Sequence, residues 1–274
     1  MGMLSIEQFI ENKLIHGRAY FSREEVHAAL GLNPQALTAA ITRLVKKRRL
    51  AIPRHGFYLT LRAEDTVTGA PDPIRWIDPL MGYLEVQYRI SLLRAAAEHG
   101  ASHQASMVFQ VIVPKQQRNI QLGRHRIQFV YQKAESFALL NAPDLHIRIK
   151  SESGFANAAG IELTLLDCAR YLRIATGIHG VAQIVKDIGA QANPRKLAKA
   201  AVAYDSATVR RLGFLLEMAG CHRQAKALMA SAQLAKSAVP LSPSLKPLLV
   251  SPVSKSEKNS KWKLLINEPV EIDF

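Results

Sequence analysis

The residues in this sequence best suited to chemistry are cations gathered near its N-terminus. Residues 1–62 contain ten Lys/Arg and four Asp/Glu, whereas the rest of the chain contains 26 and 18. Net positive charge is therefore more than twice as dense in the first segment. Its densest point is the run Lys46-Lys47-Arg48-Arg49. Such a concentration of positive charge suits a polyanion, and double-stranded DNA is the partner that we expect.

Polar side chains precede this basic run at helical spacing. Leu37, Ile41 and Leu44 mark the apolar face of a predicted helix over 33–49, which leaves the opposite face free. On that face Gln and Arg can bond base edges bidentately, and the cations at its end suit phosphates. Two further polar residues follow on a predicted hairpin. The predicted DNA-binding residues are Gln35, Thr38, Thr42, Arg43, Lys46, Lys47, Arg48, Arg49, Arg54 and His55.

The elements that must position these residues follow the order of a winged helix-turn-helix. Ser22 with Glu25 three residues later forms a capping box, which predicts the start of a helix. The break Gly31-Leu32-Asn33-Pro34 ends that helix and caps the next one. Two short strand patterns then flank a turn at Gly56, and we interpret this hairpin as the wing.

A second, larger part of the chain mixes strand and helix patterns. The Gly-, Pro- and Asp-rich segment Thr66–Pro79 predicts an exposed linker. Strands are predicted at 107–113, 119–122, 126–131 and 146–150. Helices are predicted at 78–87, 90–99, 160–174, 179–188, 194–203, 206–219 and 222–235, and a Ser/Pro/Lys-rich loop at 236–260. The fold class is therefore α+β, with a winged helix-turn-helix at 1–66 followed by a mixed α/β domain at 74–274.

Several kinds of site and location find no support in the sequence. Cys168 and Cys221 form no CxxC pair, the first residues lack the basic and apolar regions of a signal peptide, and no apolar run is long enough to cross a membrane. We therefore expect a cytoplasmic protein without membrane contact. No P-loop, GxGxxG or GxSxG motif is present, so no cofactor or catalytic residue is predicted. His99 and His103 have a zinc-like spacing but lack the Glu of HExxH, so no metal site is predicted either.

Carboxylates in the second part leave an enzyme open as an alternative. Asp144, Lys150 and Glu152 lie near predicted strand ends, where a DNA-targeted nuclease could hold its acidic residues. Glu162 and Asp167 stand five apart on a predicted helix and point about 140° from each other. They would not converge on one metal without help, and carboxylates that stabilise helix starts are the better interpretation.

The order of motifs resembles that of a known family. The segments that carry the resemblance are Trp76–Asp78, Leu80–Leu84, Ser91–Leu93, Ala95–Ala101, Val108–Val111, Glu162–Asp167, Arg211–Glu217 and Trp262–Asn267. Together with the winged helix, they look like the AbiEi antitoxin family of abortive-infection, type IV toxin–antitoxin operons. The resemblance spans nearly the whole chain apart from the loop at 236–260.

The resemblance implies that the winged helix represses the protein's own operon. It also implies that the C-terminal domain counters a nucleotidyltransferase-like toxin encoded beside it, without forming a stable complex. Because one winged helix buries only about 600–1,000 Å², we expect a dimer on an inverted-repeat operator. The residues predicted to engage the toxin's nucleic-acid substrate are Arg124, Arg126, Arg148 and Lys150. The alternative is a plain operon repressor whose second domain senses a ligand or makes a dimer.

Overall fold

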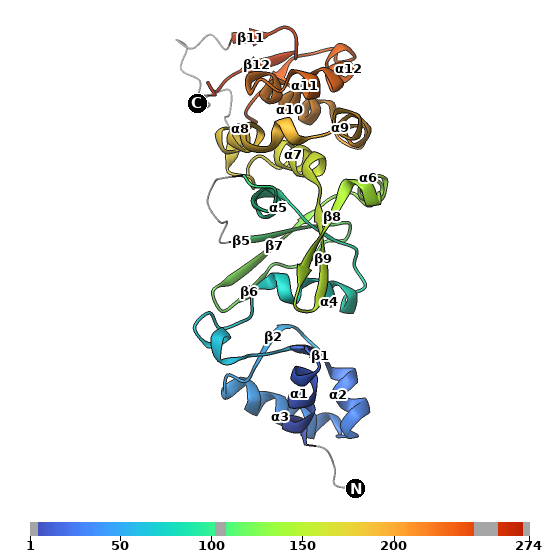
Figure 1. The fold of residues 1–274 in the computed structure, drawn as a ribbon, viewed down its shortest axis with the longest axis vertical. Helices are drawn as coiled ribbons and strands as arrows, with labels where there is room; N and C mark the ends of the chain where they lie inside the picture. The colour runs from blue at the N-terminus through green and yellow to red at the C-terminus, as the bar shows by residue number, and fades with distance from the viewer. Residues whose placement is uncertain (1–4, 102–107, 244–256, 271–274) are drawn as a thin grey trace. The chain divides into compact units, whose positions relative to one another are not determined.

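The computed structural model describes residues 5–101, 108–243 and 257–270, whose helices and strands are shown in Figure 1. They group into two compact units, each built from several segments of the chain. The first unit contains Met1–Arg89, Met107–Tyr131 and Arg148–Asn157, and the second contains Ile90–Ser106, Gln132–Ile147 and Ala158–Phe274. The predicted α+β fold class is confirmed, whereas the boundaries at 1–66 and 74–274 stay a prediction.

Three helices and a three-stranded sheet form the N-terminal module. The helices are α1 (Ile6–Ile15), α2 (Arg23–Leu30) and α3 (Pro34–Lys46). The strands are β1 (Tyr20–Ser22), β2 (Leu50–Arg54) and β3 (Phe57–Thr60), in the antiparallel order β1-β3-β2. Apolar side chains from all three helices and the sheet share one buried core. This order of helices and strands is the one predicted for a winged helix-turn-helix, with the β2–β3 hairpin in the place of the predicted wing.

Local capping explains why the predicted helix boundaries in this module agree with the structure. The Ser22 hydroxyl accepts the Glu25 N–H, and the Glu25 carboxylate accepts the Ser22 N–H at 2.8 Å. Gly31 ends α2 in the left-handed conformation at φ 60°, and Asn33 caps α3 by accepting the Ala36 N–H. The short strand β1, by contrast, is not predicted, because it exists only through pairing with β3 nearly forty residues later.

The segment after the wing is not the exposed linker that the sequence predicts. Ala70, Pro71 and Pro73 are buried, and the Arg124 N–H donates to the Thr68 carbonyl at 2.8 Å. Two short 3₁₀ turns, η1 (Ala63–Thr66) and η2 (Pro73–Arg75), complete the segment. Gly and Pro form turns in a packed segment here rather than a flexible linker. Composition alone does not distinguish a packed turn from a flexible linker.

A six-stranded sheet has the order β6-β7-β5-β4-β9-β8. Its strands are β4 (Arg89–Ile90), β5 (Val108–Val113), β6 (Ile120–Leu122), β7 (His125–Tyr131), β8 (His146–Ser151) and β9 (Gly154–Ala159). β5 runs parallel to β7, and β6 runs antiparallel to it. The four predicted strands are confirmed within the described residues. β4 and β9 are not predicted, since β4 is two residues long and β9 consists mainly of small residues with low strand propensity.

Helices make up most of the remaining chain. They are α4 (Ile77–Tyr83), α5 (Leu92–Glu98), α6 (Ala134–Leu140), α7 (Ile161–Arg170), α8 (Gly177–Ile188), α9 (Pro194–Ala201), α10 (Ser206–Met218), α11 (His222–Ala227) and α12 (Met229–Gln233). In the second unit α10 contacts α7, α8, α11 and α12, with Leu212, Leu215 and Leu216 fully buried. The predicted helix at 222–235 is split in two, and α6 is not predicted. None of the described helices combines the length and apolar character needed to span a bilayer.

A small sheet near the C-terminus corrects the predicted loop at 236–260. Its strands are β10 (Val239–Pro240), β11 (Glu257–Asn259) and β12 (Leu264–Ile266), in the order β10-β12-β11. Both ends of the predicted loop therefore belong to strands, while residues 244–256 lie outside the described part. Trp262 is fully buried before β12, and its indole N–H donates to Glu217 on α10 at 2.6 Å. This tryptophan anchors the C-terminal segment on the helices.

Candidate nucleic-acid interface

The outer face of α3 carries the side chains that the sequence predicts for base contacts. Leu37, Ile41 and Leu44 are buried in the module's core, so α3 has a fixed rotation about its axis. Four predicted residues are exposed on its outer side: Gln35, Thr38, Thr42 and Arg43. An α-helix held in this way can enter the major groove and present side chains to base edges.

Hydrogen bonds on this face restrict two of those residues. The Thr38 hydroxyl donates to the Pro34 carbonyl at 2.7 Å, and the Thr42 hydroxyl donates to the Thr38 carbonyl at 2.8 Å. The Arg23 guanidinium donates to Thr38 Oγ1 at 3.1 Å and to the Pro34 carbonyl. The threonine hydroxyls are thus bonded to the helix backbone, while the side chains of Gln35 and Arg43 make no hydrogen bond to the described residues.

Arg23 is a member of this surface that the sequence analysis missed. It begins α2, directly after the capping Ser22, and its side chain reaches across the helix-turn-helix to α3. In chain order it lies 23 positions before the basic run that begins at Lys46, so charge density did not single it out. Its position in the sequence could have identified it. Arg23 lies in the first turn of α2, from which a long side chain can reach the start of α3.

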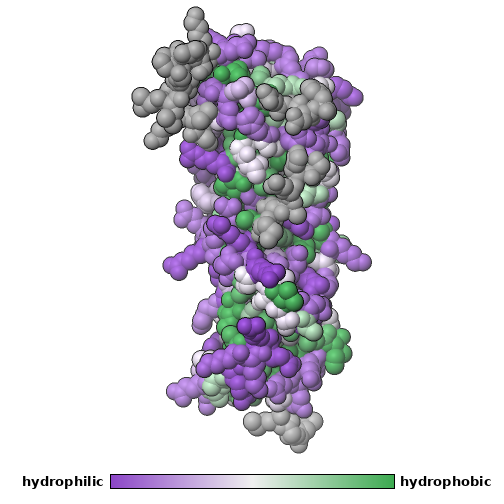
Figure 2. All heavy atoms as spheres, turned by 90° about the vertical axis from the view of Figure 1, so that its left-hand side faces the viewer, coloured by the Kyte–Doolittle hydropathy of each residue, from purple (hydrophilic) through white to green (hydrophobic). Residues whose placement is uncertain are grey.

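The basic run lies where α3 ends. Lys46, Lys47, Arg48 and Arg49 are all exposed. Arg48 has the left-handed φ of 52°, and the Arg49 N–H donates to the Leu44 carbonyl at 2.9 Å, which closes the helix. Glycine is the usual residue in this position, since a side chain there costs about 1–2 kcal/mol. Here arginine occupies the position despite this cost, so all four residues from Lys46 to Arg49 are cationic. In Figure 2 the lower part of the view, where the N-terminal module lies, shows a group of hydrophilic side chains beside smaller hydrophobic areas.

The wing presents its two predicted residues differently. His55 is exposed at the turn, and its carbonyl accepts a hydrogen bond from the Tyr83 hydroxyl at 3.2 Å. Arg54 instead donates to the Arg118 carbonyl and lies 5.8 Å from the centre of the Phe129 ring. Burial and the nearby Arg118 charge lower the pKa of Arg54. The Arg54 side chain therefore holds the wing in place within the first unit, and its contact with DNA stays a prediction.

A carboxylate holds α1 against α2 behind the candidate interface. Glu25 pairs with Lys13 at 2.9 Å and with Arg18 at 3.0 Å. Burial acts to raise the pKa of Glu25, but the hydrogen bonds from Lys13 and the Ser22 main chain, together with the Arg18 charge, lower it overall. Glu25 thereby pairs with two cations of the module at positions away from α3. The remaining positive charge is concentrated on α3 and at its end.

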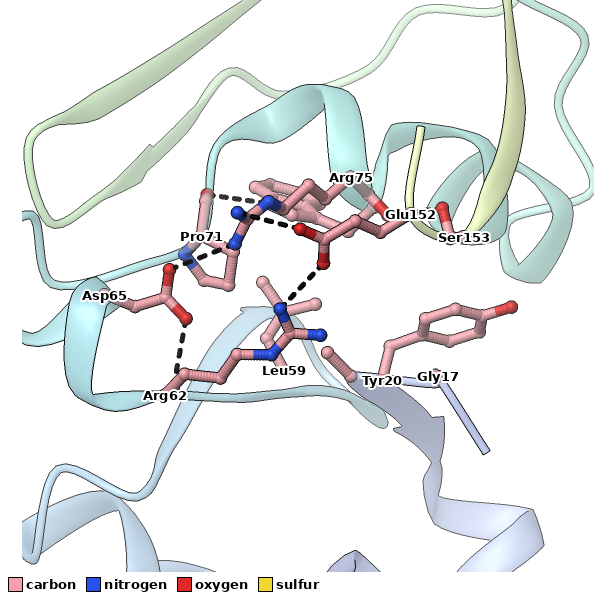
Figure 3. A pocket seen from close by; sticks show the side chains of 11 residues that line it. Gly17, Tyr20, Leu59, Arg62, Asp65, Pro71, Arg75, Glu152 and Ser153 are labelled. Carbon is pink, nitrogen blue, oxygen red and sulfur yellow. Dashed lines mark hydrogen bonds and ion pairs between the residues drawn. The ribbon is translucent and has the colours of Figure 1, made fainter. Parts of the chain in front are cut away.

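Two arginines and two carboxylates form an ion-pair network in the first unit (Figure 3). Glu152 accepts from Arg62 at 2.8 Å and from Arg75 at 2.9 Å, and Arg75 also lies 3.6 Å from Asp65. The hollow that these residues line has a volume of about 10 Å³, which is barely enough for one water molecule. Glu152, a candidate of the nuclease alternative, therefore has a structural role here.

The other acidic candidates of that alternative do not converge. Glu162 accepts the Asn193 N–H at 2.7 Å, whereas Asp167 accepts the Ser91 and Tyr204 hydroxyls at 2.7 Å each. The Asp144 side chain is exposed. Residues 5–101, 108–243 and 257–270 contain no group of three or more His, Cys, Asp and Glu placed to hold a metal ion. His99 bonds to the Ala159 carbonyl, and His103 lies outside these ranges.

The four residues predicted to form an antitoxin surface fall into two pairs in the first unit. Arg124 and Arg126 lie at the β6–β7 turn and on β7, while Arg148 and Lys150 lie on β8, and all four are exposed. In the sheet order, β5, β4 and β9 stand between β7 and β8. Four strand spacings amount to about 19 Å. The pairs are thus not one patch, and their role stays a prediction.

Comparison with known proteins agrees with the expected resemblance. Residues 89–218 match the family model described as the AbiEi antitoxin C-terminal domain, which confirms the resemblance over this segment. A solved structure of similar fold is the crystal structure of the RV2827C protein from Mycobacterium tuberculosis, with a TM-score of 0.65. It is 15% identical in sequence, and the alignment covers 94% of this chain and 89% of that one. No curated protein matches the chain in sequence.

Proposed function

We propose that the chain is a DNA-binding antitoxin, because residues 89–218 match the family model of the AbiEi antitoxin C-terminal domain. Its winged helix represses its own toxin–antitoxin operon. Its C-terminal domain counters a nucleotidyltransferase-like toxin from the same operon. The observation that carries the DNA-binding half is the exposed outer face of α3, which ends in four adjacent exposed cations.

Charge and geometry on α3 support binding to duplex DNA. The helix itself contains no Asp or Glu, and neither does the stretch that links it to the wing. Side chains able to read bases lie along the helix, while the cations lie at its end, where phosphates would flank the groove. A basic face without carboxylates is poorly explained by stability alone, because neighbouring like charges repel.

Replacing Arg43 by Ala tests base reading. Arg43 is exposed and lacks a hydrogen bond to any described residue, so it is free to bond a guanine edge. We expect its removal to cost about 1–3 kcal/mol on the cognate operator and to relax base choice at one position. Gel shifts on the operator and on random duplex measure both effects. Arg173→Ala, which removes an exposed cation from the second unit, is the matched control. Equal losses on operator and random DNA would contradict base reading by Arg43.

Growth rescue tests the antitoxin half independently of repression. The toxin is expressed from an unrelated promoter, so the winged helix cannot contribute by lowering its synthesis. We expect the full chain to rescue growth, and we expect Arg43→Ala to rescue equally well. Reversing the charge of Arg124, Arg126, Arg148 and Lys150 together should abolish rescue without unfolding the protein.

Each pair is also reversed separately, because the two pairs lie on different strands. Loss of rescue with only one pair would restrict the toxin-countering surface to β7 or to β8. Full rescue by the fourfold variant would remove this surface from the proposal. Failure of the unaltered chain to rescue would refute the antitoxin activity itself and favour a plain repressor.

A further inference from the structure

A second basic site lies in the second unit, away from the winged helix in sequence. A groove of about 550 Å³ runs between α9 and α11. Its lining consists of Asn193, Pro194, Arg195, Arg223 and Lys226. Three of these five side chains are cationic and none is acidic. The volume falls within the range of about 300–1,000 Å³ that is typical of ligand sites.

Hydrogen bonds fix the two walls of this groove. Gln224 on α11 is buried and donates to the carbonyls of Ala190 and Ala192, at 3.0 and 3.1 Å. On the other wall, Glu162 accepts the main-chain N–H of Asn193 at 2.7 Å. Gln224 therefore holds α11 beside the chain that leads into α9. The basic side chains project from a rigid frame rather than from a loop.

The charge around the groove is unbalanced. Arg195 and Lys199 stand four apart on α9, and Arg223 and Lys226 stand three apart on α11, so each pair shares a helix face. Like charges at these spacings destabilise a helix slightly. Residues 189–236 contain eight Lys/Arg and only two Asp/Glu.

Both carboxylates of that stretch bond elsewhere. Asp205 pairs with Arg170 at 2.8 Å, and Glu217 bonds Trp262 and Lys261. Lys196, the third cation of α9, donates to the Asp144 carbonyl at 2.8 Å. Within the described part of the chain, none of the five cations on α9 and α11 has a carboxylate partner. Their like charges oppose helix stability slightly, and an anion bound between the two helices would offset this repulsion.

The groove's shape and lining define the chemistry of that anion. We propose that the α9–α11 groove binds the phosphodiester backbone of a single-stranded nucleic acid. A double helix is far too wide for a groove of this volume, whereas a single strand can lie along it. Because no aromatic side chain lines the groove, bases gain no stacking platform, and recognition goes through phosphates. The site goes beyond the proposed function, since operator binding at α3 does not require it.

Fluorescence anisotropy of the full chain with labelled 12-nucleotide strands tests this site. The probes are oligo(U) RNA and oligo(dT) DNA, and the operator duplex is measured in parallel. Replacing Arg195, Arg223 and Lys226 by Gln should weaken strand binding at least tenfold. It should also lower the slope of log K against log salt by about 2, since each lost phosphate contact removes roughly 0.7 on single strands. Operator binding should change less than threefold.

The matched control replaces three exposed cations outside the groove, Arg173, Lys236 and Lys258, with the same loss of charge. Circular dichroism checks that both variants fold. Tighter binding of RNA than of DNA supports a site that also contacts the 2′-hydroxyl, and equal binding supports one that reads the backbone alone. The proposal would be overturned if both variants lost equal affinity for the strands, or if neither lost any. It would also be overturned if the protein bound tripolyphosphate but neither strand. Loss of operator binding without loss of strand binding in the groove variant would mean that the groove contacts duplex DNA, and would also overturn the proposal.

Discussion

Replacing Lys46, Lys47, Arg48 and Arg49 by Gln is expected to lower the affinity for duplex DNA on the order of a thousandfold at about 0.1 M salt. Each cation that neutralises a phosphate contributes about 0.9 to the slope of log K against log salt. Four lost contacts should therefore flatten this slope by about 3 to 4. Because phosphates carry no sequence information, operator and random duplex should lose affinity alike.

Gel shifts or anisotropy over a range of salt concentrations measure both quantities. The matched control replaces four exposed cations of the second unit, Lys133, Arg173, Lys236 and Lys258. Both variants have the same net charge, so long-range attraction is lowered equally. A control that loses as much affinity as the test variant would show that total charge, and not the end of α3, determines binding. An unchanged salt slope in the test variant would place the phosphate contacts elsewhere.

Replacing Trp262 by Ala is expected to destabilise the second unit by about 3–5 kcal/mol, as for other large side chains removed from a core. The indole is fully buried and packs against Gly213 of α10 so closely that an added Cβ there would lie 2.1 Å from the ring. Gly213→Ala alone should therefore also destabilise, by about 1–3 kcal/mol, through overpacking. Urea titrations followed by circular dichroism give the free energy of unfolding for each variant.

The double variant, Trp262→Ala with Gly213→Ala, tests whether these two residues are in contact. Once the indole is gone, the added methyl at position 213 meets no obstacle, so the two losses should combine to less than their sum. Gly82 of α4 is the matched control, because its added Cβ would meet nothing within 4 Å. Gly82→Ala should be neutral or stabilise by up to about 1 kcal/mol. Additive losses at 213 and 262 would mean that the two residues are not in contact.

Signals that depend on a few neighbouring residues predicted much of the N-terminal module. Ser22 with Glu25, Gly31 and Asn33 each act within one helical turn, because a capping side chain bonds an N–H two or three residues away. The buried face of α3 follows from the spacing of its apolar residues. The sequence therefore determined the helix-turn-helix, the wing and the residues exposed on α3.

Features that depend on distant partners were decided by the tertiary structure. β1, β4 and β9 are short or built from small residues, and each is a strand only because another strand supplies its hydrogen bonds. The segment after the wing was predicted to be exposed, yet Ala70 and Pro71 are buried by packing that composition does not encode.

The same limit applies to the candidate sites. Charge density along the chain identified the end of α3, because its four cations are consecutive. The groove between α9 and α11 went unrecognised, since Arg195 and Arg223 are 28 positions apart in sequence. Arg54 looked like a free wing cation until the structure placed the Arg118 carbonyl beside it. A sequence determines what lies within a turn of each residue, whereas the folded chain decides which distant groups share a surface and which charges are already bonded.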